Sequence, residues 1–217
     1  MKTVLLAGLI ACSLAAFGGQ VLETDNSVLK WTPDSGREVR IPAPELKIGN
    51  RPLDVVFARQ AWLRWRGVAD YVLSNGTVSV SFVNSSNALV IETITTFREP
   101  VTNDLEVVFG FDVVGEPASR MGLPERNGVF KVWPVSPESG GAGKFELGNA
   151  AKGPIQCSTL GMPVVSLMFG DSEPELAVAA DPYCGSYIQL TGGRVMVRTT
   201  YSGSLVPVTR EKRTFAL

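Results

Sequence analysis

Apolar and polar residues alternate with a period of two through most of this chain, and this alternation constrains the fold more than any other feature. In residues 104–114 the odd-numbered positions form an apolar row, Leu105, Val107, Phe109, Phe111 and Val113. In residues 88–97 one face carries Leu89, Ile91, Thr93, Thr95 and Phe97. Such alternation is typical of half-buried strands. No segment has the pattern of an ordinary amphipathic helix. We therefore predict an all-β fold, a large antiparallel two-sheet β-sandwich.

Turn-forming residues separate several of the predicted strands. Asn75-Gly76 lies between two alternating runs and is a strong hairpin signal, because both residues tolerate a positive φ. Pro33-Asp34-Ser35-Gly36 separates residues 28–32 from 37–41 in the same way. Residues 98–103 form a turn between 88–97 and 104–114, so we expect those two strands to pair antiparallel.

The remaining chain divides into short strands and one irregular region. Residues 116–161 are rich in Gly, Pro, Ser and Asn, and we expect a long excursion with a short strand at 128–133. Long loops on a sandwich often carry binding residues. Further strands are predicted at 53–58, 68–73, 164–169, 175–180, 186–190, 194–201 and 212–217.

The first 19 residues have the composition of a cleavable secretory signal. One early lysine precedes an uncharged apolar run over residues 4–17, and two glycines follow. The run is too short to span a bilayer. We therefore expect an exported protein, secreted or periplasmic, with one β-sandwich domain over residues 20–217. Leu9-Ile10-Ala11-Cys12 also matches a bacterial lipobox, so lipidation of Cys12 and attachment to the cell envelope is the alternative.

Composition excludes several kinds of chemistry. The chain contains no histidine, which excludes Ser-His-Asp and Cys-His nucleophile activation and every His-ligated metal site. The net charge is −1, and no basic stripe of the kind that binds nucleic acid is present. We expect no cofactor, no metal and no nucleic-acid partner. Any catalysis would depend on carboxylates, Tyr, Lys or Arg.

Two cysteines remain outside the leader, Cys157 and Cys184. In an exported chain such a pair is most simply a disulfide. Closing this loop would stabilise the fold by roughly 3.5 kcal/mol if the effect is entropic. Two buried free thiols or a two-cysteine metal site are the alternatives.

One predicted ligand-binding segment combines an aromatic ring with two arginines. In a continuous strand, Trp62, Arg64 and Arg66 would share one face, with Leu63 and Trp65 on the other. A ring beside guanidinium groups suits a sugar, because the ring stacks on C–H groups and arginine donates to hydroxyls. The alternative is that Trp65 lies in the core and the arginine stems cover Trp62.

Acidic residues provide the other candidate sites. Asp181 and Tyr183 lie beside Cys184, where a disulfide would hold them rigid at a loop rim, although an Asx turn before Pro182 explains Asp181 equally well. One group of acidic residues could coordinate calcium, and the alternative is an acidic turn before a strand. Another group could supply the carboxylate pair of a glycosidase, and the alternative is charges on the solvent face of a sheet. The residues concerned are Asp171, Glu173 and Glu175 for calcium, and Glu92, Glu99, Asp104, Glu106 and Asp112 for the pair.

Residues 22–32, 176–183 and 207–217 resemble segments of galactose-mutarotase-like supersandwich domains, which accompany catalytic domains in several glycoside hydrolases. The resemblance implies a large two-sheet sandwich and a role related to carbohydrate. Mutarotases use His with Glu as the acid–base pair. Because this chain has no histidine, neither that activity nor any catalytic residue carries over.

Together these features predict an exported, noncatalytic β-sandwich that binds glycans or accompanies a glycoside-hydrolase catalytic domain. Two other functions stay open: a glycan-active enzyme using carboxylates alone, and a structural or interaction protein of the cell envelope. The residues predicted to contact a glycan are Trp62, Arg64, Arg66, Asp181 and Tyr183.

Overall fold

The computed structural model is built of β-strands. In the part of the chain that it describes, no helix is long and apolar enough to cross a membrane. The described residues are 21–25, 28–33, 36–63, 66–85, 88–116, 118–124, 130–134, 146–147, 151–152, 155–156, 164–169, 176–180, 186–191 and 194–217.

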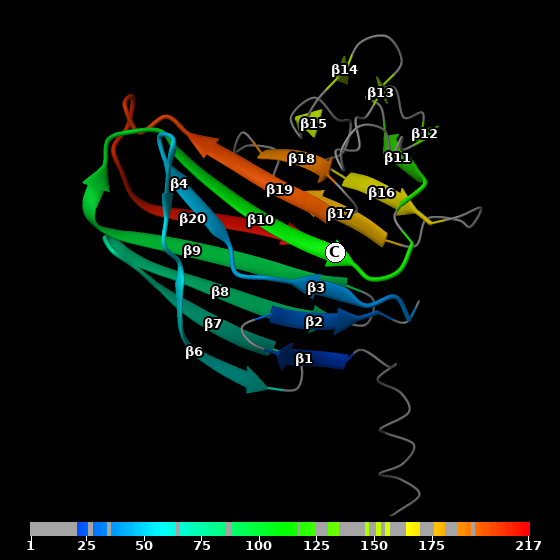
Figure 1. Ribbon diagram of the computed structural model, residues 1–217, viewed down its shortest axis with the longest axis horizontal. Helices are drawn as coiled ribbons and strands as arrows, with labels where there is room; N and C mark the ends of the chain where they lie inside the picture. Colours follow the sequence, from blue (N-terminus) through cyan, green and yellow to red (C-terminus); the bar gives the residue numbers. More distant parts are fainter. Residues whose placement is uncertain are drawn as a thin grey trace, which may run out of the picture.

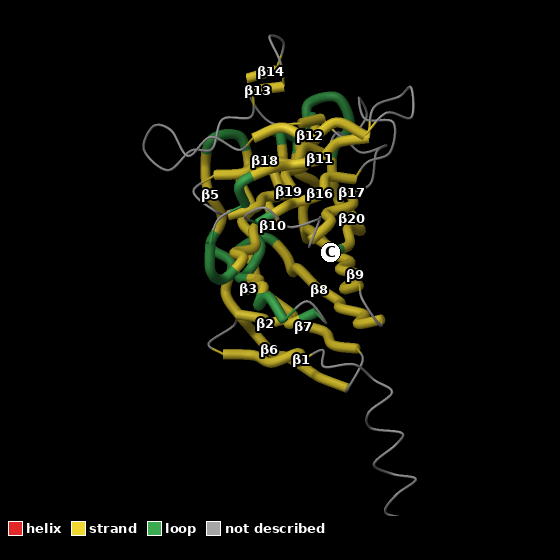
Figure 2. The backbone as a smooth tube through the Cα atoms, turned by 90° about the vertical axis from the view of Figure 1, so that its right-hand side faces the viewer, coloured by secondary structure: helices red, strands yellow, loops and turns green. Residues whose placement is uncertain are grey.

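Two nine-stranded antiparallel sheets, here sheet A and sheet B, pack against each other as the layers of a sandwich (Figures 1 and 2). Sheet A contains β1 (Val21–Asp25), β2 (Val28–Thr32), β3 (Val39–Ile41), β10 (Leu105–Val113), β19 (Arg194–Tyr201), β18 (Ser186–Thr191) and β15 (Ile155–Gln156) in this order, with β4 (Glu45–Ile48) beside β10 and β5 (Arg51–Leu53) beside β4. The predicted all-β sandwich is therefore confirmed.

Sheet B has the order β12 (Phe130–Pro134), β11 (Arg120–Pro124), β16 (Val164–Met168), β17 (Leu176–Ala180), β20 (Val208–Ala216), β9 (Ala88–Val101), β8 (Gly76–Ser85), β7 (Arg66–Leu73) and β6 (Val56–Leu63). A separate two-stranded sheet pairs β13 (Glu146–Leu147) with β14 (Ala151–Lys152). Several predicted strands agree closely with observed ones, including 28–32 with β2 and 194–201 with β19.

The core lies between the two sheets and is built from the alternating apolar rows. Leu105, Phe109 and Phe111 of β10 are buried, as are Leu89 and Ile91 of β9. The ring centroids of Phe109 in sheet A and Phe215 in sheet B are 4.9 Å apart, so the two layers are in direct contact. The burial of these rows on the inner faces confirms the predicted core.

The predicted pairing of residues 88–97 with 104–114 is wrong. β9 pairs with β8 and β20 in sheet B, whereas β10 pairs with β19, β3 and β4 in sheet A. The segment from Thr102 to Asp104 therefore carries the chain from one sheet to the other. Alternation indicates which face of a strand is buried. It does not indicate in which sheet the strand lies, because the inner faces of both sheets are buried.

The predicted hairpins are confirmed as strand pairings, but the turn of the first consists of Ser74 and Asn75 rather than of Asn75 and Gly76. β7 and β8 pair across a turn at Ser74 and Asn75, with Leu73 opposite Gly76. The Asn75 side chain also accepts a hydrogen bond of 3.1 Å from the backbone N–H of Glu99, which ties the turn to β9. β2 and β3 pair antiparallel, and the Gly36 N–H donates to the Pro33 carbonyl at 2.8 Å.

A second crossover joins β19 of sheet A to β20 of sheet B through residues 202–207. It packs against the first one at the same end of the sandwich (upper left in Figure 1). The Ser202 hydroxyl donates to the Asp104 carboxylate at 3.1 Å. Gly203 lies against the Val101 and Asn103 carbonyls, where a Cβ would clash with backbone atoms. The sheets are thus connected twice in one place.

Candidate functional site

The outer face of sheet A carries charged side chains in neighbouring strands. Residues of β10 with odd numbers point into the core, so the intervening even-numbered residues face outward. The same alternation turns the charged residues of β4 and β19 outward, because Leu46, Val195 and Val197 are core residues. We call the resulting set the outer-face ladder; it consists of Glu45, Lys47, Glu106, Asp112, Arg194 and Arg198.

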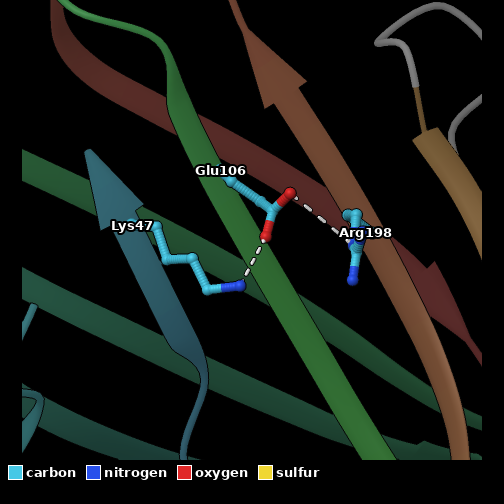
Figure 3. A network of polar contacts seen from close by, with 3 residues as sticks. All are labelled: Lys47, Glu106 and Arg198. Carbon is cyan, nitrogen blue, oxygen red and sulfur yellow. Dashed lines mark hydrogen bonds and ion pairs between the residues drawn. The ribbon is translucent and has the colours of Figure 1, made fainter. Parts of the chain in front are cut away.

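Glu106 occupies the centre of one half of the ladder (Figure 3). Its carboxylate accepts a hydrogen bond from Lys47 Nζ at 3.1 Å, and its other oxygen is 3.7 Å from Arg198 Nε. The three residues come from β4, β10 and β19, which are adjacent in sheet A. A carboxylate held between two cations keeps a fixed orientation on the sheet surface.

Arg194 forms the other half of the ladder. Its Nη2 donates to Glu45 at 3.2 Å, and its Nε is 4.0 Å from Asp112 Oδ1. Glu45 lies on β4, so the arginine side chain must cross β10 to reach it. Gly110 makes this crossing possible, since a Cβ at that position would clash with the guanidinium.

The ladder is an array of hydrogen-bonding groups on the outer face of sheet A. Val108 faces the same side and is only 2% exposed; in the register it stands between Glu45 and Arg198. Guanidinium groups donate several hydrogen bonds and carboxylates accept them, so the surface offers both kinds of partner side by side. A polyhydroxylated molecule, whose hydroxyl groups both donate and accept, fits such an array.

Trp62 and Arg66, two of the residues predicted to bind a glycan, lie in different strands. β6 ends at Leu63 and β7 begins at Arg66, with Trp62 opposite Gly67 and Arg66 opposite Leu63. The argument that placed both residues on one face assumed a single continuous strand, so it does not apply. Arg66 is exposed.

The two segments of the predicted glycan site attach to distant strands of sheet B. Trp62 lies in the edge strand β6, and β17 ends at Ala180, directly before Asp181 in the sequence. Ala180 and Trp62 fall on one cross-strand row, through Phe215, Ile91, Phe82 and Gly67. Five steps along this row, at about 4.8 Å each, give about 24 Å. The shared site stays a prediction.

Several predictions concern residues outside the described part of the chain. They are the leader with Cys12, Arg64, the Cys157–Cys184 pair, Asp181 with Tyr183, and the calcium candidates Asp171, Glu173 and Glu175. Within the described residues, no group of three or more Cys, Asp or Glu side chains is placed to hold a metal ion.

A second polar cluster, which the sequence reasoning missed, lies between the sheets. Glu211 is 3% exposed, and its carboxylate accepts a hydrogen bond of 2.7 Å from the Tyr201 hydroxyl. Arg213 Nε is 3.1 Å from the same carboxylate oxygen. The sequence contains a sign of this cluster. Glu211 and Arg213 alternate along the strand with the same spacing of two as the core residues Phe215 and Leu217, so they lie on the same face. Charged residues in a core row indicate a buried ion pair.

Burial raises the pKa of the Glu211 carboxyl to about 7, and the neighbouring Thr95 hydroxyl acts in the opposite direction. The charged Arg213 nearby also favours the ionised form. In the ladder, by contrast, the carboxylates are partly exposed. Glu92, another predicted carboxylate, pairs with Lys212 at 2.6 Å on the outer face of sheet B.

No protein-family profile matches the chain, and neither does any curated protein sequence. The fold is similar to that of solved structures. The alpha-N-acetylgalactosaminidase NagBb from Bifidobacterium bifidum, solved as a GalNAc complex, matches with a TM-score of 0.58 and 15% identity over 93% of this chain. The Slr1438 protein from Synechocystis sp. PCC 6803 matches with a TM-score of 0.43 and 10% identity, over 92% of this chain and 94% of its own.

The chain spans 35% of the length of the NagBb chain that it matches. At this level of identity the match concerns the fold alone: one portion of the NagBb chain has a similar fold. The predicted resemblance to sandwich domains of carbohydrate-active enzymes is thus supported for the architecture.

Proposed function

We propose that this protein is an exported, noncatalytic β-sandwich domain that binds carbohydrate on the outer-face ladder of sheet A. The observation that carries the proposal is the fixed arrangement of Glu106 between Lys47 and Arg198. The Glu106 carboxylate contacts both Lys47 and Arg198, so the three side chains restrain one another and present their donors and acceptors in an ordered arrangement. Pre-ordered groups cost less conformational entropy on binding than free side chains.

The charge of the ladder favours a neutral glycan. Each carboxylate of the ladder has a cation within 4.0 Å, so the array has no large excess of either sign. A strongly anionic polysaccharide would have to compete with the carboxylates for the same cations. Neutral hydroxyl and acetamido groups can bind to the remaining N–H groups and oxygen lone pairs instead.

The fold supports the same proposal. Its likeness to a portion of NagBb links this architecture to a protein solved with a bound sugar, and the leader composition predicts export. A glycosidase acid needs a carboxyl group that holds its proton near neutral pH and reaches the glycosidic oxygen. Glu211 has a raised pKa but is buried between the sheets, where a polysaccharide cannot reach it.

The proposal is tested by measuring binding to an array of neutral oligosaccharides, with GalNAc-terminated and uronic-acid-containing glycans included. We expect binding to a neutral class, weakened about tenfold or more by Glu106→Gln, because a hydrogen bond to a charged group contributes about 1.5–3 kcal/mol. Lys212→Gln is the matched control, since it breaks a cross-strand ion pair on sheet B and leaves the ladder intact.

Four outcomes would contradict the proposal. One is the absence of binding to every glycan, and another is unchanged binding by Glu106→Gln. The third is loss of binding in Trp62→Ala but not in Glu106→Gln, which would show that glycans bind at β6 and not at the ladder. Turnover of any oligosaccharide would show that the domain is catalytic.

A further inference from the structure

The core between the two sheets contains a group of polar side chains from three strands. β9 and β20 of sheet B and β19 of sheet A each contribute two successive inward-facing residues to it. We call this set the polar seam; it consists of Thr93, Thr95, Glu211, Arg213, Thr199 and Tyr201. Water from the surface hardly reaches it, since Thr93 is 1% exposed and Thr199 is 3% exposed. The seam therefore depends on hydrogen bonds formed inside the protein.

One end of the seam joins the two sheets by direct contact. The Tyr201 hydroxyl of β19 donates to the Glu211 carboxylate of β20 at 2.7 Å. Arg213 Nε is 3.1 Å from the same carboxylate oxygen, and the Arg213 guanidinium carbon is 4.2 Å from the centre of the Tyr201 ring. At this end, side chains of the two sheets therefore touch each other without an intermediary.

The other end of the seam contains a buried hydroxyl group that forms no direct contact of this kind. Thr93 lies opposite Arg213 in the register of β9 and β20, one inward position along from Thr95 and Glu211. Among the residues that the structure describes, none forms a hydrogen bond with Thr93 Oγ1. Buried polar atoms of folded proteins are nearly always bonded to protein or to ordered water. The Thr93 hydroxyl therefore indicates a partner other than the described side chains.

A small cavity adjoins this hydroxyl group. Its polar walls come from both layers, with Thr93 and Arg213 of sheet B on one side and Thr199 of sheet A on the other. The apolar part of the lining includes Phe109 and Phe215. The cavity has a volume of about 10 Å³, which is about the smallest that can hold one water molecule. A sugar ring or any organic ligand of similar size is too large for it.

We propose that this cavity is a binding site for a single water molecule that bridges sheet B to sheet A. The water bonds to Thr93 Oγ1, to the Thr199 hydroxyl and to the Arg213 guanidinium. A hydroxyl both donates and accepts, and a guanidinium carries five N–H donors. The three side chains thus supply the two to four polar partners that a buried water needs. A connection through water continues the direct one between Tyr201 and Glu211.

The charges around the cavity favour a neutral occupant. Arg213 is the cation in its wall, and the Glu211 carboxylate at 3.1 Å balances that charge. A chloride ion would therefore add an uncompensated negative charge between the sheets, where desolvation is costly. A small cation would be repelled by the guanidinium. Water carries no net charge, and it can donate to one neighbour while it accepts from another.

The site is tested by Thr93→Val, which replaces the hydroxyl with a methyl group of similar size. Oxygen-17 relaxation dispersion of the solvent counts the long-lived water molecules inside a protein, and hydroxyl protons do not contribute to it. We expect Thr93→Val to hold one such water fewer than wild type. The matched control is Thr96→Val, the same substitution at an exposed position of β9, which should leave the number unchanged. Equal numbers in Thr93→Val and wild type would overturn the proposal.

The stability of Thr93→Val distinguishes a hydrated hydroxyl from one without any bond. If water bonds to the hydroxyl, its removal should raise the unfolding equilibrium constant about two- to tenfold, the range for one net hydrogen bond. If nothing bonds to it, the methyl group should lower that constant, because a buried unpaired polar atom is removed. Urea unfolding measures the change. A variant as stable as wild type, or more stable, would contradict the water site.

A crystal structure of the wild-type protein remains decisive if Thr93→Val does not fold. Electron density for an ordered water should lie within about 3.0 Å of Thr93 Oγ1. An empty cavity, at a resolution that reveals other ordered waters, would overturn the proposal. An anomalous peak in the cavity of crystals soaked in bromide would identify an anion as the occupant and would refute a neutral one.

Discussion

Glu106 and Glu211 have similar partners, but Glu106 lies on the outer face of sheet A and Glu211 lies on the inner face of sheet B. Each carboxyl accepts a hydrogen bond from one side chain, Lys47 or Tyr201, and lies near an arginine, Arg198 or Arg213. The Glu106 side chain is 21% exposed and that of Glu211 is 0% exposed. The same chemistry therefore yields a polar surface in one place and a sealed link between layers in the other.

The difference in environment determines what each cluster can do. Exposed ion pairs contribute about 0–1 kcal/mol to stability, so the ladder is free to serve binding. A buried pair costs desolvation energy and becomes strongly destabilising when one partner is removed. We therefore expect substitutions in the cluster of Glu211, Tyr201 and Arg213 to change the free energy of unfolding, and substitutions in the ladder to change ligand binding.

Removal of the buried carboxyl should have the largest effect. Glu211→Ala leaves the Arg213 cation without its counter-charge between the sheets, and we expect a loss of about 3–5 kcal/mol in the free energy of unfolding. Urea denaturation at pH 7 measures it. The double variant Glu211→Leu/Arg213→Leu should recover most of the loss, because no unpaired charge remains. A loss below about 1 kcal/mol would mean that the interior cluster behaves like the exposed one.

Tyr201→Phe removes only the hydroxyl that joins the sheets. The ring and its contact with Arg213 remain, so we expect a smaller loss, about 1–2 kcal/mol, from the missing hydrogen bond to a buried carboxyl. Thermal unfolding followed by circular dichroism gives the comparison with wild type. An unchanged midpoint would show that this hydrogen bond does not fasten the sheets.

Gly110→Ala tests the ladder without removing a charge. The new Cβ would displace the Arg194 guanidinium from its path to Glu45. Because a flexible side chain can move aside, we expect a loss of stability of about 1 kcal/mol or less, but weaker glycan binding. Calorimetric titration separates the two quantities. Binding equal to wild type would exclude Arg194 from the site.

Glu106→Gln should have the smallest effect on folding. We expect a change of about 0–1 kcal/mol in the free energy of unfolding, and a smaller one at high salt because exposed charges are screened. Denaturation at low and high ionic strength measures both. A loss as large as that of Glu211→Ala would remove the distinction between the two clusters.

The sequence was sufficient to predict the class of fold and many of its strands. Alternation identified the core rows of β9 and β10, and Asn75-Gly76 identified the β7–β8 hairpin. It could not assign strands to sheets, because the inner face of either sheet buries an apolar row equally well. That is why β9 and β10 were expected to pair although they belong to different layers.

The candidate sites were harder to predict. Arg194 reaches Glu45 across Gly110, and these three residues lie far apart in the sequence. No local pattern indicates such a contact. Glu211 and Arg213 were detectable from their place in a core row, but their partner Tyr201 belongs to the other sheet. Pairings between strands of different sheets depend on topology, which one sequence does not specify.

The most direct test of the proposed function is to map glycan binding on the molecule. Backbone amide shifts of labelled wild-type protein should be recorded by NMR during titration with the neutral oligosaccharide that binds best on the array. We predict that the largest changes fall on β4, β10 and β19, around Lys47, Glu106 and Arg198, and that Glu106→Gln requires about tenfold or more glycan to produce them. Changes confined to β6 and β7, or no change at saturating glycan, would contradict carbohydrate binding by the ladder.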